Sequence, residues 1–412
     1  METHAARRGG FLGHAFLLSL GVLFGFGLLE VAARILVASQ PEVTMGEQGV
    51  YEQFDPILGW RNRPGAVVEY RRREYRTRVE INSLGFRDVE RSPQRTPGVT
   101  RIIALGDSFV EGYTVERDQS VTRRIESLGG AAGCRVEVIN AGVHAYSTDQ
   151  EALWFQNEAE ALSPDLVLVF VYYNDILNNV RVNYWGAAKP VVTVADGKLA
   201  VSNLPLPGAP KDTAPGHVQV RPARPEDGSA LMNLVNGRTL MGAPRLHRFL
   251  SRLGLWAPVE PESIPDELRA YKSRAHLPEF DQAWRQTSAI LGALGRTIRA
   301  RGGSPVLVHV PARFEISDRD WELTLLRYGI DPKTWDRGLV RQRLEGIASQ
   351  EGWAFLDLTE ALKSAGGALR GEPYFQYDGH WNPLGHDAAA RAVVDFLRQR
   401  SLVPCGGNTR PS

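Results

Sequence analysis

Cysteine is scarce in this chain: Cys134 and Cys405 are the only two among 412 residues. Two cysteines so far apart give no disulfide framework, no C-x-x-C motif and no zinc-ligand spacing. A bond between them would require an oxidising compartment, and we favour two unpaired thiols over a structural disulfide. The sequence therefore does not predict a small disulfide-stapled scaffold or a cysteine-ligated metal centre.

An excess of charge of one sign is also missing. The chain has 48 Lys and Arg against 47 Asp and Glu, a formal net charge of +1. Without a broadly basic surface field, a nucleic-acid partner is not expected. With 43% hydrophobic and 23% charged residues, the composition is that of a globular protein with one large core and some appendages.

Only one long hydrophobic run is present. From Gly9 to Leu29 the chain carries no Asp, Glu, Lys or Arg, and about 20 such residues span the ~30 Å hydrocarbon layer of a membrane. The run exceeds the ~7–15 apolar residues of a cleaved secretory signal, which is the alternative, and Val37-Ala38-Ser39 only weakly matches a cleavage site. We predict an uncleaved, single-pass anchor over residues 1–37.

The charges that flank this run predict its orientation. Arg7 and Arg8 precede it, so the positive-inside rule keeps the amino terminus in the cytoplasm and sends the remainder across. We expect the catalytic part to be extracytoplasmic, in the periplasm or outside the cell. Glu30 and Arg34 follow at helical spacing and are expected to form an ion pair at the far interface.

Residues 38–98 are polar and interrupted by proline. One alternating segment, Tyr75–Ile81, predicts a strand, and Val67–Tyr70 is its expected hairpin partner. We interpret the region as a linker and a small β extension that packs on the main domain.

The main domain, 99–404, alternates apolar runs with helical segments. Runs rich in Val, Ile and Leu without strict alternation predict parallel strands covered on both faces. The predicted strands are Ile102–Leu105, Val136–Ile139, Leu166–Val171, Pro305–Val310 and Ala354–Leu358. The predicted helices are Gln119–Leu128, Asp149–Ala161, Glu279–Arg301, Leu339–Gln350 and 385–400. The fold class is α/β: a doubly wound, flavodoxin-like sandwich with a five-stranded parallel sheet.

An insertion at about 181–278 interrupts this alternation with a proline-rich middle, and residues 405–412 form a tail. So long a connection is typical of a binding loop, a lid or a spacer. Its later part, Ala230–Leu255, is apolar enough to form one or two helices over the site.

Polar residues follow the predicted strands where working groups gather in an open parallel sheet. Ser108 follows the first strand, Gly142 the second and Asn174 the third, while Asp378 and His380 come after the fifth. A serine with a later Asp and His is how separate loops supply a nucleophile, a base and the group that orients the base. We expect these segments to converge at one edge of the sheet.

In order along the chain, Gly106-Asp107-Ser108, Gly142, Asn174-Asp175 and Asp378-Gly379-His380 resemble the four blocks of the SGNH (GDSL-type) hydrolase superfamily. The resemblance covers about 101–397 apart from the insertion. It implies an acyl-serine mechanism in which Ser108 attacks, His380 is the base and Asp378 orients it. It also implies an oxyanion hole made of the Ser108 and Gly142 backbone N–H groups and the Asn174 side-chain amide.

This chain departs from the superfamily pattern at two points. One residue separates Asp378 from His380 where two are usual, a spacing similar to that of the alginate-acetylation branch, and Tyr172 stands where the third block commonly begins with glycine. Upstream, Leu58-Gly59-Trp60 and 82–88 are similar to the lead-in of membrane-anchored bacterial members. The expected base, His380, is present, and the choice between hydrolysis and acyl transfer stays open.

The leading hypothesis is a membrane-tethered serine esterase that removes an O-acyl group, plausibly acetyl, from a cell-envelope or exported glycan. An O-acetyltransferase that moves the acyl group to a polysaccharide is the alternative. A non-catalytic protein that binds a polysaccharide or an assembly partner is the second alternative. A Rossmann-type dinucleotide binder and an α/β-hydrolase lack their G-x-G-x-x-G and G-x-S-x-G motifs. No metal or organic cofactor is implied.

Overall fold

The computed structural model describes residues 3–38, 41–44, 50–208, 219–222, 229–256, 259–273, 277–367 and 371–406. The chain divides into two compact units. The smaller unit comprises Met1–Thr44 and Val218–Glu260, and the larger unit comprises Met45–His217 and Pro261–Ser412. The middle of the predicted insertion thus groups with the amino-terminal helix, while its two ends belong to the larger unit.

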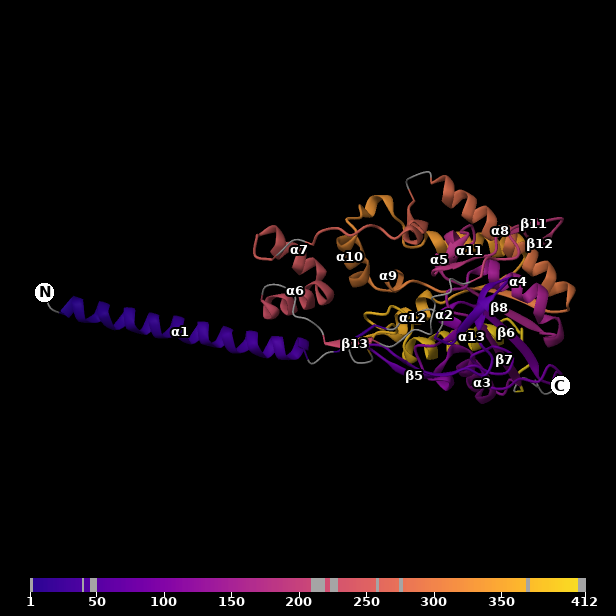
Figure 1. Ribbon diagram of the computed structural model, residues 1–412, viewed down its shortest axis with the longest axis horizontal. Coiled ribbons are helices and arrows are strands. Elements are labelled where there is room, and N and C mark those ends of the chain that lie inside the picture. Colours follow the sequence, from indigo (N-terminus) through magenta and orange to yellow (C-terminus); the bar gives the residue numbers. More distant parts are fainter. Residues whose placement is uncertain are drawn as a thin grey trace, which may run out of the picture. The chain divides into compact units, whose positions relative to one another are not determined.

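A five-stranded sheet forms the centre of the larger unit (Figure 1). Its strands are β6 (Thr100–Gly106), β7 (Val136–Gly142), β8 (Leu166–Val171), β14 (Ser304–His309) and β15 (Ala354–Asp357). All neighbouring pairs are parallel, in the order β15-β14-β8-β6-β7. Numbered along the chain this is 2-1-3-4-5, the flavodoxin-like order, which confirms the predicted fold class.

Helices cover both faces of this sheet because each strand buries side chains on both sides. In β6, Ile103 and Leu105 face one core, and Ile102 and Ala104 face the other. The first core is closed by α4 (Thr148–Glu158), α8 (Pro278–Ala300) and α11 (Leu339–Glu351). The second is closed by α3 (Val121–Ala131), α12 (Thr359–Ala365) and α13 (Pro383–Gln399). Every predicted helix of the main domain is present.

Short elements complete the larger unit. Antiparallel pairs are formed by β2 (Glu52–Asp55) with β3 (Gly59–Asn62), β4 (Val67–Arg71) with β5 (Arg76–Glu80), β9 (Asn183–Tyr184) with β10 (Ala187–Ala188), and β11 (Val192–Ala195) with β12 (Lys198–Val201). The remaining short helices are α2 (Ser108–Glu111), α5 (Tyr173–Asn178), α9 (Arg313–Ile316) and α10 (Asp318–Arg327). The 3-10 turns are Arg117–Gln119, Ala159–Leu162, Asp266–Tyr271 and Pro332–Thr334. The β4–β5 hairpin is the β extension predicted from the sequence.

The smaller unit is built on one long helix, α1 (Thr3–Ala38). Among the described residues, one segment, Phe16–Val37, is long and apolar enough to cross a membrane. Strand β1 (Pro41–Thr44) pairs with β13 (Gln219–Pro222), and α6 (Ala230–Gly242) and α7 (Pro244–Arg252) follow. The expected Glu30–Arg34 ion pair is present at 2.8 Å.

The two cysteines correct one expectation. Cys134 and Cys405 form a disulfide across 271 residues and also pair as an isolated antiparallel bridge. The two thiols are therefore not free. The pairing could not be predicted from their positions in the sequence. It arises because the carboxyl-terminal tail returns to the segment between α3 and β7.

Candidate active site

Ser108 stands where the chain leaves the central sheet. Strand β6 ends at Gly106, and α2 begins at Ser108. The Asp107 carboxylate accepts a hydrogen bond of 2.9 Å from the Phe109 N–H, which caps this short helix. Asp107 thus has a visible structural task. The sharp turn presents the Ser108 hydroxyl at the carboxyl edge of the sheet.

The structure brings the predicted serine, histidine and aspartate together. Ser108 Oγ lies 2.8 Å from His380 Nε2, and His380 Nδ1 lies 2.6 Å from Asp378 Oδ1. Both are hydrogen-bond distances. They join the three side chains in the order that a nucleophile, its base and the acid that orients the base would need. The single residue between Asp378 and His380 is Gly379, whose φ of +84° is a left-handed conformation that glycine adopts without strain.

Electrostatics keep Asp378 ionised. Burial raises the pKa of this carboxyl, but the hydrogen bond and charge of His380 and the hydrogen bond from Tyr75 lower it more, to about 2. A carboxylate held in this form stabilises positive charge on the neighbouring imidazole.

The loop that carries Asp378 is organised by the β4–β5 hairpin. The Glu74 carboxylate accepts hydrogen bonds of 2.7, 2.8 and 2.9 Å from the backbone N–H groups of Gln376, Tyr377 and Asp378. The next residue, Tyr75, donates its hydroxyl to Asp378 Oδ2 at 2.8 Å. Neither role could be predicted from the sequence, because neither residue lies near a motif and both contacts span about 300 positions.

Aromatic rings surround the His380 imidazole. The Phe109 ring lies 4.8 Å from it, and the Tyr113 ring meets it edge-on at 5.3 Å. Tyr113 stacks on His144 at 4.7 Å, and His144 stacks in turn on Trp185 at 4.8 Å. Burial lowers the pKa of His144 to about 3, so this ring is neutral. The stack runs from the base to the turn between β9 and β10, inside the predicted insertion.

Gly142 lies beside α2, the helix that begins at Ser108, but its backbone N–H already donates a hydrogen bond within the protein. The N–H donates to Asn140 Oδ1 at 3.0 Å, which conflicts with the oxyanion role predicted for Gly142. A Cβ at this position would lie 2.3 Å from the Glu111 nitrogen. Glycine is therefore required here for the close approach of β7 to α2, which is a packing reason.

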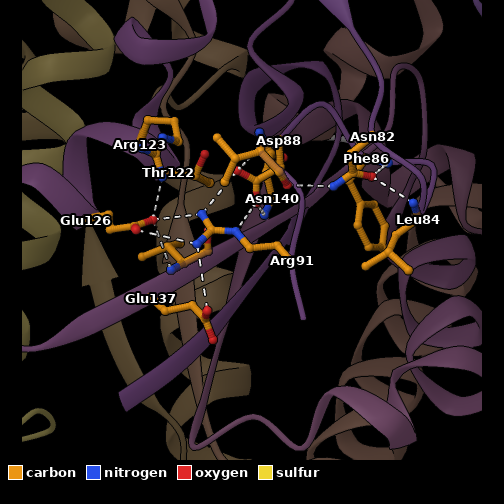
Figure 2. Close-up of polar contacts among 12 residues, drawn as sticks. Asn82, Leu84, Phe86, Asp88, Arg91, Thr122, Arg123, Glu126, Glu137 and Asn140 are labelled. Carbon is orange, nitrogen blue, oxygen red and sulfur yellow. Dashed lines mark hydrogen bonds and ion pairs between the residues drawn. The ribbon is translucent and has the colours of Figure 1, made fainter. Parts of the chain in front are cut away.

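Asn140 ties these segments together. Its side-chain amide donates to the Val110 carbonyl at 3.0 Å, so it holds the helix that begins at Ser108. Figure 2 shows Asn140 beside Asp88, whose carboxylate accepts the Asn140 N–H at 3.3 Å and pairs with Arg91 at 2.9 Å. Arg91 pairs further with Glu126 of α3 at 2.8 Å. This network fixes β7 behind Ser108.

The backbone after Gly142 forms a turn with an unusual residue. Ala145 is buried and has a φ of +61°, although it carries a Cβ. The turn closes with a hydrogen bond of 3.1 Å from the Tyr146 N–H to the Val143 carbonyl. Within the part of the chain that the structure describes, the Ala145 N–H has no acceptor. Strained backbone of this kind concentrates at functional sites.

Asn174 is the second residue of α5, directly after β8, and Asp175 caps the first turn of this helix by accepting the Tyr172 N–H at 3.1 Å. Among the described residues, the buried Asn174 side-chain oxygen has no partner. The β9–β10 hairpin reaches this edge of the sheet through Trp185, whose ring stacks on His144 at 4.8 Å.

Three buried carboxyl groups lie behind this edge of the sheet. Burial raises the pKa of Asp107 to about 6, and it raises the pKa values of Glu151 and Asp175 well above their usual range.

Among the residues that the structure describes, no group of three or more His, Cys, Asp or Glu side chains is arranged to hold a metal ion.

Comparison with known proteins assigns the family. The profile of the GDSL-like Lipase/Acylhydrolase family matches residues 104–388, more than half of the chain. The chain belongs to this family and is an ester-bond hydrolase. A search of curated proteins finds no match.

Solved structures with a similar fold are distant. The structure of TesA has a TM-score of 0.38 and 12% identity, covering 73% of this chain and 99% of that one. The lipase/acylhydrolase from Enterococcus faecalis has a TM-score of 0.36 and 12% identity, covering 75% and 100%. The psychrotrophic esterase EstA from Pseudoalteromonas sp. has a TM-score of 0.36 and 10% identity, covering 73% and 98%.

Proposed function

We propose that this protein is a serine esterase in which Ser108 is the nucleophile, His380 the base and Asp378 the group that orients it. The observation that carries the proposal is the pair of short contacts, 2.8 Å from Ser108 Oγ to His380 Nε2 and 2.6 Å from His380 Nδ1 to Asp378. An aliphatic hydroxyl is a poor nucleophile until a base removes its proton, and this geometry supplies the base.

The reaction follows from these contacts. Ser108 Oγ attacks the acyl carbon while its proton passes to His380 Nε2, and the carbonyl oxygen becomes negative. His380 then gives the proton to the leaving alcohol, and an acyl-serine remains. A water molecule attacks this ester while one of its protons passes to His380, which then gives that proton to Ser108 Oγ as the acid leaves and free Ser108 is restored.

The negative oxygen needs donors fixed in advance. We propose the Ser108 N–H, the Asn174 side-chain amide and the Ala145 N–H. Ala145 replaces Gly142 in this assignment because the Gly142 N–H is taken by Asn140 at 3.0 Å. The positive φ of Ala145 and the lack of an acceptor for its N–H among the described residues support it.

We further propose that the substrate carries a small acyl group, acetyl, on a cell-envelope or exported glycan. The rings of Tyr113, His144 and Trp185 form a continuous stack beside the base. Tyr113 and His144 are buried, so the half-buried Trp185 ring is the one that a substrate can reach, and a flat aromatic surface suits the apolar face of a sugar ring.

We also propose a single-pass anchor in α1 with the catalytic unit outside the cytoplasm. The apolar segment Phe16–Val37 and the preceding Arg7 and Arg8 support this orientation. The Cys134–Cys405 disulfide supports it independently, because disulfides persist in oxidising compartments. Accessibility of the disulfide to a membrane-impermeant reductant in intact cells tests the orientation; resistance until the cells are lysed would contradict it.

Transfer of the acyl group to a sugar hydroxyl is the second candidate. The β9–β10 hairpin, which reaches the site through Trp185, favours it, because excluding water slows hydrolysis of an acyl-serine.

One experiment separates these candidates. The full chain in detergent is incubated with an aryl acetate, with and without an oligosaccharide acceptor. Release of acetate that Ser108→Ala abolishes indicates hydrolysis, and labelling of the acceptor indicates transfer. Ser92→Ala, which changes a serine outside the site, is the matched control. Equal rates for the chain and for Ser108→Ala would refute the catalytic proposal and leave the binding protein.

A further inference from the structure

The paired helices α6 and α7 of the smaller unit have an unusual surface. Residues 229–256 contain four arginines, Arg238, Arg245, Arg248 and Arg252, and no aspartate or glutamate. On α7 and just after it, Leu246, Phe249, Leu253 and Leu255 are 51%, 57%, 57% and 62% exposed. The first three are spaced i, i+3 and i+7, so they form one apolar stripe on the helix.

The contact between α7 and α6 uses the opposite, more polar face. His247 is buried, and its Nε2 lies 2.7 Å from Asn236 Oδ1 on α6. Pro244 is buried beside it. A helix of a soluble protein turns its apolar face inward, whereas α7 turns it outward. The stripe therefore requires an apolar environment outside this unit.

The position of α6 on α1 indicates which environment this is. The Glu30 carboxylate accepts hydrogen bonds from the N–H groups of Ala230 and Leu231 at 2.8 and 2.9 Å and from the Ser229 hydroxyl at 2.7 Å. It thereby caps the first turn of α6 from the side of α1. Ala33, one turn further along α1, is buried. Glu30 is also the first charge after the apolar run Gly9–Leu29, and it lies in the carboxyl-terminal part of the segment Phe16–Val37, so α6 begins near the end of α1 that leaves the hydrocarbon layer.

We propose that α6 and α7 lie in the surface of the same membrane that α1 enters, on anionic phospholipid. Leu246, Phe249 and Leu253 enter the acyl region, while the arginines face lipid phosphates. Basic amphipathic helices bind this way, through buried apolar area together with attraction to anionic headgroups. The inference rests on the proposed anchor and is independent of the chemistry at Ser108.

The test uses the full chain in nanodiscs of phosphatidylcholine and phosphatidylglycerol, 7 to 3. Phe249→Cys is labelled with the fluorophore NBD; the two native cysteines are bonded to each other and do not react. Lys363→Cys, at an exposed position of the larger unit, is the matched control. We expect lipid-borne doxyl groups to quench the label at 249 at least threefold more than the label at 363, and aqueous iodide to show the reverse preference. Changing Arg245, Arg248 and Arg252 to Gln should reduce the quenching by doxyl lipids.

Three results would overturn the inference. One is equal iodide quenching at 249 and 363. Another is protection of 249 only in discs that hold two copies, which would assign the stripe to self-association. The third comes from a label at Leu23→Cys, which reports on α1 alone: iodide access there shows that the anchor is wrong, and the inference falls with it. A protected Leu23 with an exposed 249 removes only the surface-binding inference, and hydrolysis of a soluble aryl acetate separately tests the catalytic proposal.

Discussion

Tyr75 donates its hydroxyl to Asp378 across 303 positions of the chain, at 2.8 Å. The other oxygen of the same carboxylate faces His380 at 2.6 Å. A hairpin that precedes the hydrolase-like domain in sequence therefore supplies a contact to its proposed acid. The loop that carries Asp378 and His380 is thus held from outside by Glu74 and Tyr75.

Tyr75→Phe should lower kcat by ~10- to 100-fold with little change in KM. The hydroxyl makes a hydrogen bond to a charged group, worth ~1.5–3 kcal/mol, and 1.36 kcal/mol corresponds to tenfold in rate. Tyr377→Phe, which changes a tyrosine of the same loop with a 57% exposed side chain, is the control and should change little. Steady-state hydrolysis of an aryl acetate measures both. Full activity in Tyr75→Phe would show that the hairpin contributes only structure.

Asn174→Ala should lower kcat by ~10²–10³, the usual cost of one oxyanion donor. Asn174→Asp should be impaired as well, because a carboxylate cannot donate to a negative oxygen. Circular dichroism and thermal unfolding check that both variants fold. Near-normal turnover in either one would remove Asn174 from the site.

Ala145→Gly should keep kcat within about threefold, because the backbone N–H proposed as a donor remains and glycine tolerates the φ of +61°.

Gly142→Ala should instead lower the free energy of unfolding, because its Cβ would meet the Glu111 nitrogen at 2.3 Å. Denaturant unfolding and turnover are measured on both. A stable, active Gly142→Ala would contradict the packing reason for this glycine.

The sequence was enough to predict the sheet because its strands are buried on both faces and therefore appear as apolar runs. It also indicated Ser108, Asp378 and His380, since residues that follow parallel strands meet at one edge. Residue type alone did not show that the Gly142 N–H donates to Asn140, so the sequence pointed to Gly142, whereas Ala145 is the donor that we propose. Tyr75, Glu74 and the Cys134–Cys405 bond depend on contacts between distant segments, which no local pattern records.

Lys189 provides a test of how the insertion is attached. Its ammonium group is fully buried and contacts Asp149 Oδ1 at 2.7 Å, Ser147 Oγ at 2.7 Å and Gln150 Oε1 at 2.9 Å. Lys189→Met should lower the free energy of unfolding by ~3–5 kcal/mol, because Asp149 would remain buried without its counter-charge. Lys198→Met, an exposed lysine of the same insertion, should change little. Equal unfolding midpoints in denaturant would show that the buried pair contributes no net stability.

Deprotonation of His309 should lower the free energy of unfolding as the pH rises above neutral. Burial lowers the pKa of His309, but Glu315 at 3.6 Å and Asp357 at 2.9 Å outweigh it and raise the pKa to about 9. Because this value lies above the ~6.5 of an unfolded histidine, the protonated form stabilises the fold. That stability is fully present below pH ~6.5 and is lost as the pH rises through 9, about 3 kcal/mol in all.

Denaturant unfolding between pH 6 and 10 measures this loss, and His309→Gln, which cannot titrate, is the control. The comparison is needed because burial also raises the pKa of Glu111, to about 8, so ionisation of Glu111 destabilises the fold in part of the same range. The variant should retain the Glu111 component and lose the His309 component. Parallel pH profiles for the two proteins would mean that His309 is not protonated in the folded state, and that Glu315 and Asp357 do not hold a charged imidazole between them.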